Sequence, residues 1–413
     1  MRPLGRAGNS VAKTKNMETV FIDGSTGEGG GQILRTSLAL ACITRKSLHI
    51  ENIRAARRNP GLVKQHLAAV QAAREICDAQ DSGAAISSKV LDFQPGPVQA
   101  GQYNFDIGSA GSASLVIQTI LPALFLADKP STVTVVGGTH NPWAPPYDFL
   151  CETFLPAVAT AGFQANCRLI KHGFFPAGGG KITFDIQPRR LRSELALSLP
   201  KGQAWQKQKE KTIDFCKPMK KSKIYGRIYT SKLPIHIAEK QKKLLLKSKL
   251  DFQNIEHIEV IDSVGAGNCV MIRLSSPSRI TVFTAFGMKG KPSEEVIGEV
   301  IKLATDFFES GAAIDRFLAD QLLIYMAMNT HFSQNSETGT RQPGPSLRSE
   351  PALSLPKGRL CAHACGGVLG GCYTTNELSS HLQTNMEIIK KFLPVSFNIE
   401  QQGQIYKISC QGC

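Results

Sequence analysis

The chain alternates short runs typical of β-strands with longer amphipathic runs typical of helices, and turn residues separate them. From about Val20 to Ile107 the predicted order is strand, helix, strand, helix, strand, strand. From about Ala113 to Ile186 a similar order follows. A unit of this kind buries its apolar faces by packing helices on sheets, and its recurrence indicates a repeated core. The sequence therefore predicts an α/β (α+β) fold with repeated βαβαββ-type modules.

The composition shifts towards lysine and glutamine after about Gln187, and residues 240–249 form a dense lysine run. The layered pattern resumes with a strand at Ile280 and a helix at Ser293. We therefore expect a smaller inserted α/β domain between two parts of the core. The expected division is a disordered leader over residues 1–17, the first two core modules over 18–187, the inserted domain over 188–280, and the third core module over 281–413.

Two segments, 191–202 and 347–358, differ only at Leu195 in the first and Pro351 in the second. They are far more alike than the structural repeats of this chain. We interpret them as a mobile element inserted in surface loops, where added residues cost little free energy. A functional repeat is the alternative.

The charge balance is strongly basic. The chain has 48 Lys plus Arg against 33 Asp plus Glu, a formal net charge of +15, and such a field attracts polyanions. Nucleic acid is the expected partner class, and a basic protein without a nucleic-acid partner is the alternative. No run of about 18 apolar residues occurs, and residues 1–16 lack the apolar centre of a secretory signal. We expect no membrane partner and a cytoplasmic location.

The 11 cysteines show no paired spacing of the kind that binds zinc. Without a secretion signal, reduced thiols are the default expectation. His363 between Cys361 and Cys365 is the alternative metal site.

A glycine-rich turn, Asp23–Gln32, lies between a predicted strand and a predicted helix. Glycines let the backbone approach a phosphate closely, and helix N-termini favour anions. The turn is not a P-loop, because no Lys-Ser or Lys-Thr pair follows the glycines. Glu28 is an acid suited to a metal ion, and Arg35 is suited to a phosphate. A tight turn with a surface ion pair is the alternative.

An arginine-rich loop carries Arg54, Arg57 and Arg58 and leads into a helix with Gln65 and His66 in its first turns. Several guanidinium groups in a short loop repel one another unless an anion neutralises them. The loop therefore predicts a phosphate-binding site. A solvated basic loop is the alternative.

Four further segments each contain candidate site residues, but none of them identifies a function on its own. A small-residue loop at 108–112 opens a helix that contains Gln118, and a proline-rich segment at 137–146 carries Trp143. The segment 317–321 puts Asp320 and Gln321 in an otherwise apolar helix. His381 has hydroxyl-rich neighbours that would keep it neutral and nucleophilic, and a purely structural histidine is the alternative.

Taken together and in this order, these segments resemble the RNA 3'-terminal phosphate cyclase family. The resemblance covers about Glu18 to Glu400 and rests on seven segments: DGSTGEGGGQILR, IRAARRNPGLVKQHL, IGSAGSASLVIQT, GGTHNPWAPPYDF, KHGFFPAGGG, FLADQ and SSHLQTN. It implies a core of three βαβαββ-type modules resembling the C-terminal domain of a translation initiation factor. It also implies a smaller inserted domain before the third module.

The resemblance further implies a reaction in which His381 attacks the α-phosphorus of ATP. The AMP would pass to an RNA 3'-phosphate, and the neighbouring 2'-hydroxyl would then close a 2',3'-cyclic phosphate. By motif position, the implied roles are Glu28 for Mg or Mn; Arg35, Arg54, Arg57 and Gln65 for the phosphate of the RNA end; and Gln118, Phe317, Leu318, Ala319, Asp320 and Gln321 for ATP.

Two rival functions remain open. One is a cyclase-like ribosome-assembly factor without adenylylation, and the other is a transferase on similar modules, such as an enolpyruvyl transferase. The presence of His381 and of the arginines favours the enzyme over the first rival. The second near-identical segment precedes His381, and loops usually tolerate such additions, so we expect activity to survive.

Overall fold

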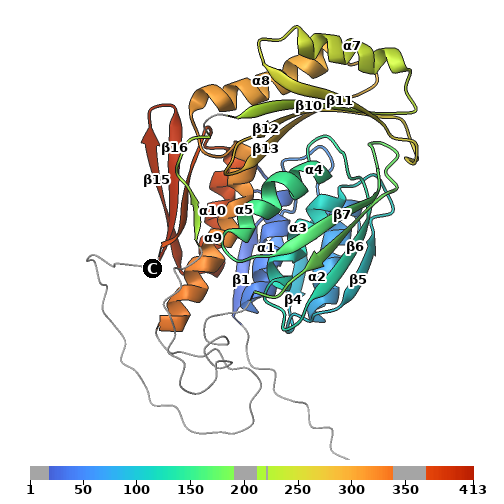
Figure 1. Ribbon diagram of the computed structural model, residues 1–413. Coiled ribbons are helices and arrows are strands. Elements are labelled where there is room, and N and C mark those ends of the chain that lie inside the picture. The colour runs from blue at the N-terminus through green and yellow to red at the C-terminus, as the bar shows by residue number, and fades with distance from the viewer. Residues whose placement is uncertain (1–17, 190–211, 220–221, 338–368) are drawn as a thin grey trace, which may run out of the picture.

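The computed structural model describes residues 18–189, 212–219, 222–337 and 369–413 (Figure 1). The expected leader and both near-identical segments lie outside the described residues. Within the described part, no helix combines the length and the apolar character needed to cross a membrane.

The first two units share one topology. The first contains β1 (Thr19–Asp23), α1 (Gly31–Thr44), β2 (Ser47–Glu51), α2 (Lys64–Cys77), β3 (Gln80–Ser82) and β4 (Leu91–Gln94). The second contains β5 (Gln102–Asp106), α3 (Ala113–Leu124), β6 (Ser131–Gly137), the consecutive helical segments α4 (Tyr147–Phe149), η1 (Leu150–Phe154) and α5 (Leu155–Ala159), β7 (Ala165–Lys171) and β8 (Gly180–Ile186). Their sheets run β1-β2-β4-β3 and β5-β6-β8-β7. Both units are therefore βαβαββ, in agreement with the predicted fold class.

The boundary between these two units differs from the prediction. The strand expected at 103–107 opens the second unit, where β5 pairs in parallel with β6. The third strand of the first unit is instead β3, which pairs with β4. Its three residues are Gln, Asp and Ser, so no apolar alternation marks it as a strand.

The inserted unit has its own sheet and core. It contains β10 (Lys223–Ser231), α7 (Ile235–Leu246), β11 (Phe252–Glu259), β12 (Gly267–Ser275), β13 (Ile280–Gly287) and α8 (Ser293–Ser310), with strand order β11-β10-β12-β13. Helices α7 and α8 lie on the same side of this sheet (Figure 1). Ile228, Val270 and Phe283 form a separate apolar cluster with side chains of α8.

The third unit is interrupted by the inserted one. It contains β9 (Ile213–Phe215), α9 (Arg316–Glu337), β14 (Leu369–Thr375), α10 (Ser380–Phe392), β15 (Val395–Gln402) and β16 (Ile405–Gly412), with order β15-β16-β14-β9. Strand β9 pairs in parallel with β14 across the inserted unit. The expected boundary at 280 is therefore wrong for β13 and α8, which belong to the inserted sheet. Periodicity identified both elements but could not say which sheet they join.

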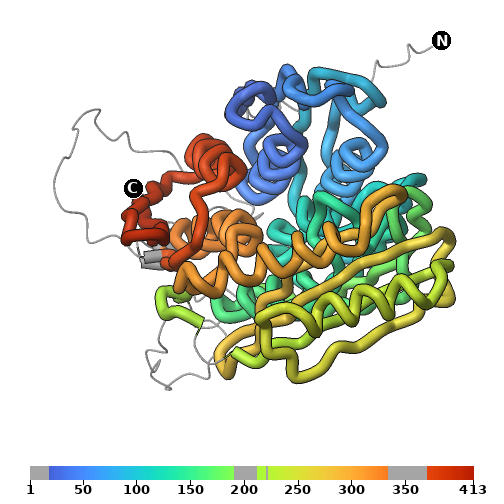
Figure 2. The backbone as a smooth tube through the Cα atoms, turned by 90° about the horizontal axis from the view of Figure 1, so that it is seen from above, coloured from blue at the N-terminus to red at the C-terminus, as the bar shows by residue number. Residues whose placement is uncertain are grey.

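The three core units pack their helices together, with the sheets outside. Helix α1 packs on α2, α3 and α10, and α10 packs on α9. The first and third units consequently lie side by side, although they stand at opposite ends of the chain (Figure 2). One apolar core runs through all three units.

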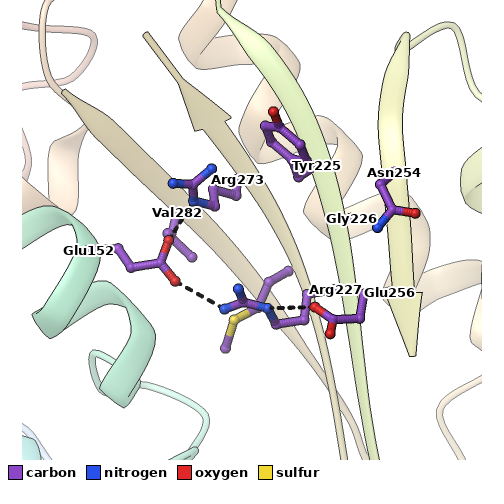
Figure 3. A pocket seen from close by; sticks show the side chains of 9 residues that line it. Glu152, Tyr225, Gly226, Arg227, Asn254, Glu256, Arg273 and Val282 are labelled. Atoms are coloured by element: carbon purple, nitrogen blue, oxygen red, sulfur yellow. Dashed lines mark hydrogen bonds and ion pairs between the residues drawn. The ribbon is translucent and has the colours of Figure 1, made fainter. Parts of the chain in front are cut away.

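A charged network fastens the inserted sheet to the second unit (Figure 3). Glu152 of η1 accepts hydrogen bonds from Arg273 at 2.5 Å and from Arg227 at 3.0 Å. Arg227 and the Tyr229 hydroxyl donate to the buried Asp148 carboxylate at 2.6 and 2.8 Å. Burial acts to raise the pKa of Asp148. The hydrogen bond to His140 is the largest of the opposing interactions, and together they lower the pKa to about 2.

Cys151 and Cys167 are joined as a disulfide between η1 and β7. This differs from the expectation of reduced thiols. Seven other cysteines in the described part of the chain are free.

Candidate active site

Glu28 and His381 meet between the first and third units. Glu28 lies in the glycine-rich loop before α1, and His381 lies in the first turn of α10. Nε2 of His381 is 2.8 Å from Oε2 of Glu28, and Nδ1 of His381 contacts Oε1 of Gln32. The packing of α1 against α10 therefore brings together two predicted site residues from opposite ends of the chain.

A side-chain cap positions the start of α10. The Ser379 hydroxyl accepts a hydrogen bond from the Leu382 backbone at 3.0 Å and donates one to Asp320 at 2.8 Å. A capping hydroxyl satisfies an otherwise unpaired backbone N–H at a helix start. The cap thus links the first turn of α10, which carries His381, to α9.

Two glycines of the glycine-rich loop have left-handed backbones, with φ of 59° at Gly27 and 55° at Gly29. A Cβ at Gly27 would overlap the Thr384 hydroxyl, and one at Gly29 would lie 2.6 Å from the Ala56 side chain. The loop therefore packs closely against α10 and against the arginine-rich loop. Helix α1 begins without a side-chain cap, so its first backbone N–H groups are suited to an anion.

Guanidinium groups surround this loop. Arg57 pairs with Glu28 at 3.2 Å. Burial lowers the pKa of Arg35 to about 10, and the Glu28 carboxylate opposes this shift. Burial acts to raise the pKa of Glu28, but the His381 hydrogen bond and the charges of His381, Arg57 and Arg35 lower it overall. Glu28 is therefore an ionised carboxylate among cationic groups.

Arg54 points back into its own loop. It donates to the carbonyl oxygens of Asn59 at 2.8 Å and Gly61 at 2.7 Å. Burial and then the charge of Arg57 lower its pKa. Arg54 therefore shapes the loop while adding to its positive field.

His66 was noted in the sequence only as a neighbour of the arginine-rich loop. It is buried, and its Nε2 lies where a Cβ on Gly31 would stand. Burial and then the charges of Arg35, Arg54 and Arg57 lower the pKa of His66 to about 3. A neutral imidazole here adds no further repulsion to the guanidinium groups.

Two predicted binding residues bridge the units. The Gln65 side-chain carbonyl accepts a hydrogen bond from the Ser112 backbone at 2.6 Å, which ties α2 to the small-residue loop at 108–112. Gln118 donates to the Gln321 side chain, which ties α3 to α9. Neither residue contacts His381 directly among the interactions of the described residues.

The segment 317–321 divides into two faces. Phe317 is exposed, and the guanidinium of Arg316 lies 4.8 Å from its ring centroid. Burial raises the pKa of Asp320 to about 7, although the Ser379 hydrogen bond opposes the shift. The side chains of Leu318 and Ala319 are buried in the main core. These two side chains therefore offer no accessible surface for the expected contact with a nucleotide, because the helix turns them inward.

The tertiary contacts of His381 act on its pKa, whereas its hydroxyl-rich neighbours in the sequence predicted a neutral imidazole. The hydrogen bond to Glu28 raises its pKa, burial opposes the shift, and the charges of Glu28 and Asp320 add to the rise. Both ring nitrogens face acceptor oxygens, an arrangement that favours the doubly protonated imidazolium. Further contacts join α10 to the first unit: Thr36 of α1 donates to Asn385 at 2.8 Å, and the Thr384 hydroxyl lies against Gly27 of the glycine-rich loop. Gln32, Thr384 and Asn385 stand inside the quoted segments and Thr36 directly follows the first of them, but their pairings depend on the packing of the helices.

A sequence model of the RNA 3'-terminal phosphate cyclase family matches residues 26–399 of this chain. The chain belongs to this family. It is similar to proteins named RNA 3'-terminal phosphate cyclase: 37% identical over 398 residues to that of Koribacter versatilis, covering 96% of each chain, and 34% identical over 398 residues to that of Pseudomonas fluorescens, covering 95% of this chain and 98% of the relative. That of Salmonella agona is 35% identical over 391 residues, covering 94% of this chain and 96% of the relative.

The carboxylate of Glu28, in the glycine-rich loop, is a side chain suited to a metal ion. Mg²⁺ commonly takes one or two protein carboxylates and completes its shell with phosphate and water oxygens, so a single ionised Glu28 fits such an ion. Within the described residues, a separate group of possible ligand atoms within 4.8 Å of one another comprises Asp214, Cys216 and Cys372. That group does not include Glu28.

Proposed function

We propose that this chain is an ATP-dependent RNA 3'-terminal phosphate cyclase in which His381 carries AMP covalently. The observation that carries the proposal is the contact of His381 with Glu28 on one ring nitrogen and Gln32 on the other, beside Arg35 and Arg57. A neutral imidazole needs one protonated nitrogen and one free lone pair to act as a nucleophile. The carbonyl of Gln32 can hold the proton on Nδ1.

In the first step, Glu28 accepts the proton from Nε2 of His381. The Nε2 lone pair then attacks the α-phosphorus of ATP, a P–N bond forms, and the bond to pyrophosphate breaks. Glu28 lies within the distance that direct proton transfer requires. Pyrophosphate leaves with the electron pair of the broken P–O bond.

In the second step, an oxygen of the RNA 3'-phosphate attacks the phosphorus of the histidine-bound AMP. The P–N bond breaks, its electron pair returns to Nε2, and an RNA-adenylate forms. The adjacent 2'-hydroxyl then attacks the RNA phosphate and expels AMP, whose phosphate takes the hydroxyl proton, to leave the 2',3'-cyclic phosphate. Adenylylation supplies the leaving group that a phosphate monoester lacks.

The arginines would stabilise the negative charge of these phosphates. Arg35 and Arg57 face the Glu28 loop, and Arg54 adds to the field from within its own loop. Preorganised positive groups in a site of this kind supply a large share of the stabilisation of phosphoryl transfer. We propose that Gln65 supports the phosphate of the RNA end through its bond to the 108–112 loop.

The adenosine of ATP would lie against Gln118, Phe317, Asp320 and Gln321. Phe317 is exposed and offers a ring face, while Gln118 and Gln321 offer amide groups. Oε1 of Glu28 would hold Mg²⁺ or Mn²⁺ with the phosphates of ATP, as hard cations bind carboxylate and phosphate oxygens, while Oε2 faces His381 and Arg57. Such an ion, when bound, would neutralise phosphate charge.

The test is incubation with α-labelled ATP and Mg²⁺ or Mn²⁺, followed by denaturing electrophoresis and acid treatment. Label that is lost in acid from the parent protein, and absent from folded His381→Ala and His381→Asn, is expected. His49→Ala is the matched control, because His49 also pairs with a carboxylate, Asp92, at 2.7 Å. Full labelling of His381→Ala would refute the assignment, and no label on any folded protein would favour a non-catalytic member of the family.

A further inference from the structure

We infer that a cavity at the start of α2 binds the nucleobase of an RNA nucleotide next to the 3'-phosphate, by stacking on Trp143 beside Phe175. This inference rests on the proposed function and names how the same site holds its RNA. The cavity has a volume of about 450 Å³. It lies where four segments meet: the start of α2, the 108–112 loop, the 141–144 segment and the loop between β7 and β8.

The side chain of Trp143 is unusually exposed to solvent. Its side chain is 82% exposed, and its backbone is left-handed, with φ of 62°. Tryptophan is highly buried on average, and a bulky residue at positive φ is a costly conformation. Strain of this kind gathers at binding and catalytic sites, where the surrounding structure maintains it.

Phe175 forms a second aromatic wall. Its ring is 6.2 Å from that of Trp143, edge to face at 78°, and it is 48% exposed. Both residues line the cavity, together with Pro142 and Pro176. Exposed aromatic faces beside rigid proline walls suit a flat ring, and stacking of this kind tolerates every base because each has a π face.

The walls of the cavity are tied together before any ligand arrives. Asn141 donates to the Ala110 carbonyl at 2.5 Å, and the Gly138 backbone donates to the Gly111 carbonyl at 2.7 Å. A Cβ at Gly178 would lie 2.7 Å from the Cα of Ala110, so the β7–β8 loop also packs closely on this segment. A preformed pocket loses little conformational entropy when a ligand binds.

Gln65 connects the cavity with the phosphate side of the site. It lines the cavity and is followed in the chain by His66, which packs against Gly31 and lies beside Arg35. Lys64, one residue earlier, donates to the Gly108 carbonyl at 3.1 Å. A positive group, Lys64, therefore stands at the 108–112 loop that lines the cavity, and aromatic rings line the same cavity, the combination that single-stranded nucleic acid recognition uses.

The residues that line the cavity favour a base of the RNA over the adenine of ATP as its occupant. None of Gln118, Phe317, Asp320 and Gln321 lines the cavity, whereas Gln65 does. The adenine is therefore expected on the α9 side of α3, and the cavity is left for a base of the RNA strand.

The experiment uses intrinsic fluorescence. The chain has two tryptophans, Trp143 and Trp205, so Trp205→Phe leaves Trp143 as the single indole. Titration with a short RNA that ends in a 3'-phosphate is expected to quench this emission. The same RNA with an abasic terminal nucleotide and an abasic penultimate nucleotide is expected to bind about 10-fold more weakly, the loss typical of one stacked base.

Substitutions of Trp143 separate an effect on RNA binding from an effect on ATP binding. Trp143→Ala is expected to raise the Kd for the intact RNA by roughly 10-fold or more, measured by anisotropy of a labelled RNA, and Trp143→Phe is expected to recover part of that loss. AMP labelling of the protein without RNA should stay at the parent level. Phe308→Ala on α8 is the control, since Phe308 is also an exposed aromatic ring and stands far from these segments in the chain.

Two results would overturn the inference. Equal affinity for the intact and the doubly abasic RNA would show that no base occupies the cavity. Quenching by ATP alone, or loss of AMP labelling in Trp143→Ala, would assign the cavity to the adenine of ATP. Failure of AMP labelling in the parent protein would instead refute the proposed function, and the RNA titration remains readable in that case.

Discussion

Oε2 of Glu28 lies 2.8 Å from Nε2 of His381, and this contact raises the pKa of the imidazole that the proposed reaction needs in its neutral form. The carboxylate thereby stabilises the imidazolium and stands ready to accept its proton. The contact joins a loop of the first unit to a helix of the third, so it exists only when both units are packed together.

Glu28→Gln is expected to shift the pH dependence of AMP labelling. Because Glu28 raises the pKa of His381, the neutral nucleophile appears only as pH rises through that raised value. Removing the carboxylate lowers the pKa, so the acidic limb of the rate profile should move to lower pH, while the maximal rate falls by about 10²-fold or more for loss of the base. Initial rates of labelling across pH measure both effects. Asp92→Asn, which removes the partner of His49, should leave the profile in place.

Gly27→Ala is expected to disturb the site beyond the cost of its backbone conformation. A left-handed alanine costs about 1 kcal/mol wherever it stands. Gly403→Ala provides this baseline, because Gly403 has φ of 63° and no atom near its would-be Cβ. Gly27→Ala adds an overlap with Thr384, so it should unfold at lower urea concentration than Gly403→Ala and lose AMP labelling. Equal midpoints and equal labelling for the two variants would show that the close approach has no consequence.

Asp148→Asn is expected to loosen the inserted unit. Removing one partner from a buried charged network typically costs about 3–5 kcal/mol. The pKa of Asp148 is lowered to about 2 from its ordinary value of 3.8, so its stabilisation is present above pH 4 and is lost as pH falls through about 2. Urea unfolding at several pH values should show a difference from the parent that narrows in acid. Asp306→Asn, which removes the exposed partner of Lys302, should change stability by less than about 1 kcal/mol.

Asp320→Asn is expected to stabilise the protein at higher pH. Burial raises the pKa of Asp320 to about 7 from 3.8, so the folded protein holds a proton that the unfolded chain has lost between these values. Stability therefore falls as pH rises across this window, and an asparagine removes that dependence. The unfolding midpoints of parent and variant should diverge between pH 5 and pH 8, with the variant higher at pH 8. Parallel midpoints across this range would contradict the raised pKa.

RNA binding is expected to weaken as the salt concentration rises. The arginines should contribute more to this salt dependence than the lysines of α7 do. Each phosphate contact contributes about −0.7 to the slope of log affinity against log salt for a single strand. Arg57→Gln should reduce the slope by about this amount. The double change Lys242→Gln and Lys243→Gln, on exposed positions of α7, tests whether the basic helix also contacts RNA, as its lysine run suggests. A slope unchanged by both sets would locate the RNA elsewhere.

The secondary structure of the first two units was largely predictable, because their helices and strands have clear apolar periods. Strand β3 was not, since its residues are polar and its pairing with β4 alone makes it a strand. The limits of the inserted unit could not be predicted for a related reason: β13 and α8 have ordinary amphipathic patterns, and only hydrogen bonding to β12 assigns β13 to the inserted sheet. Local sequence specifies which elements form, and partners distant in the chain specify their place.

The sequence by itself determined which candidate reactive groups this protein carries, because its glycine-rich loop, its clustered arginines and its histidine between hydroxyl groups can be recognised from local residue order. The tertiary structure decided how those groups act. It set Glu28 against His381, a contact that raises the pKa of the imidazole, and it turned Leu318 and Ala319 into the core. It also gathered Trp143, Phe175 and Gln65 around one cavity. Charge, burial and stacking depend on distances between residues far apart in the chain, and those distances exist only after the units have packed.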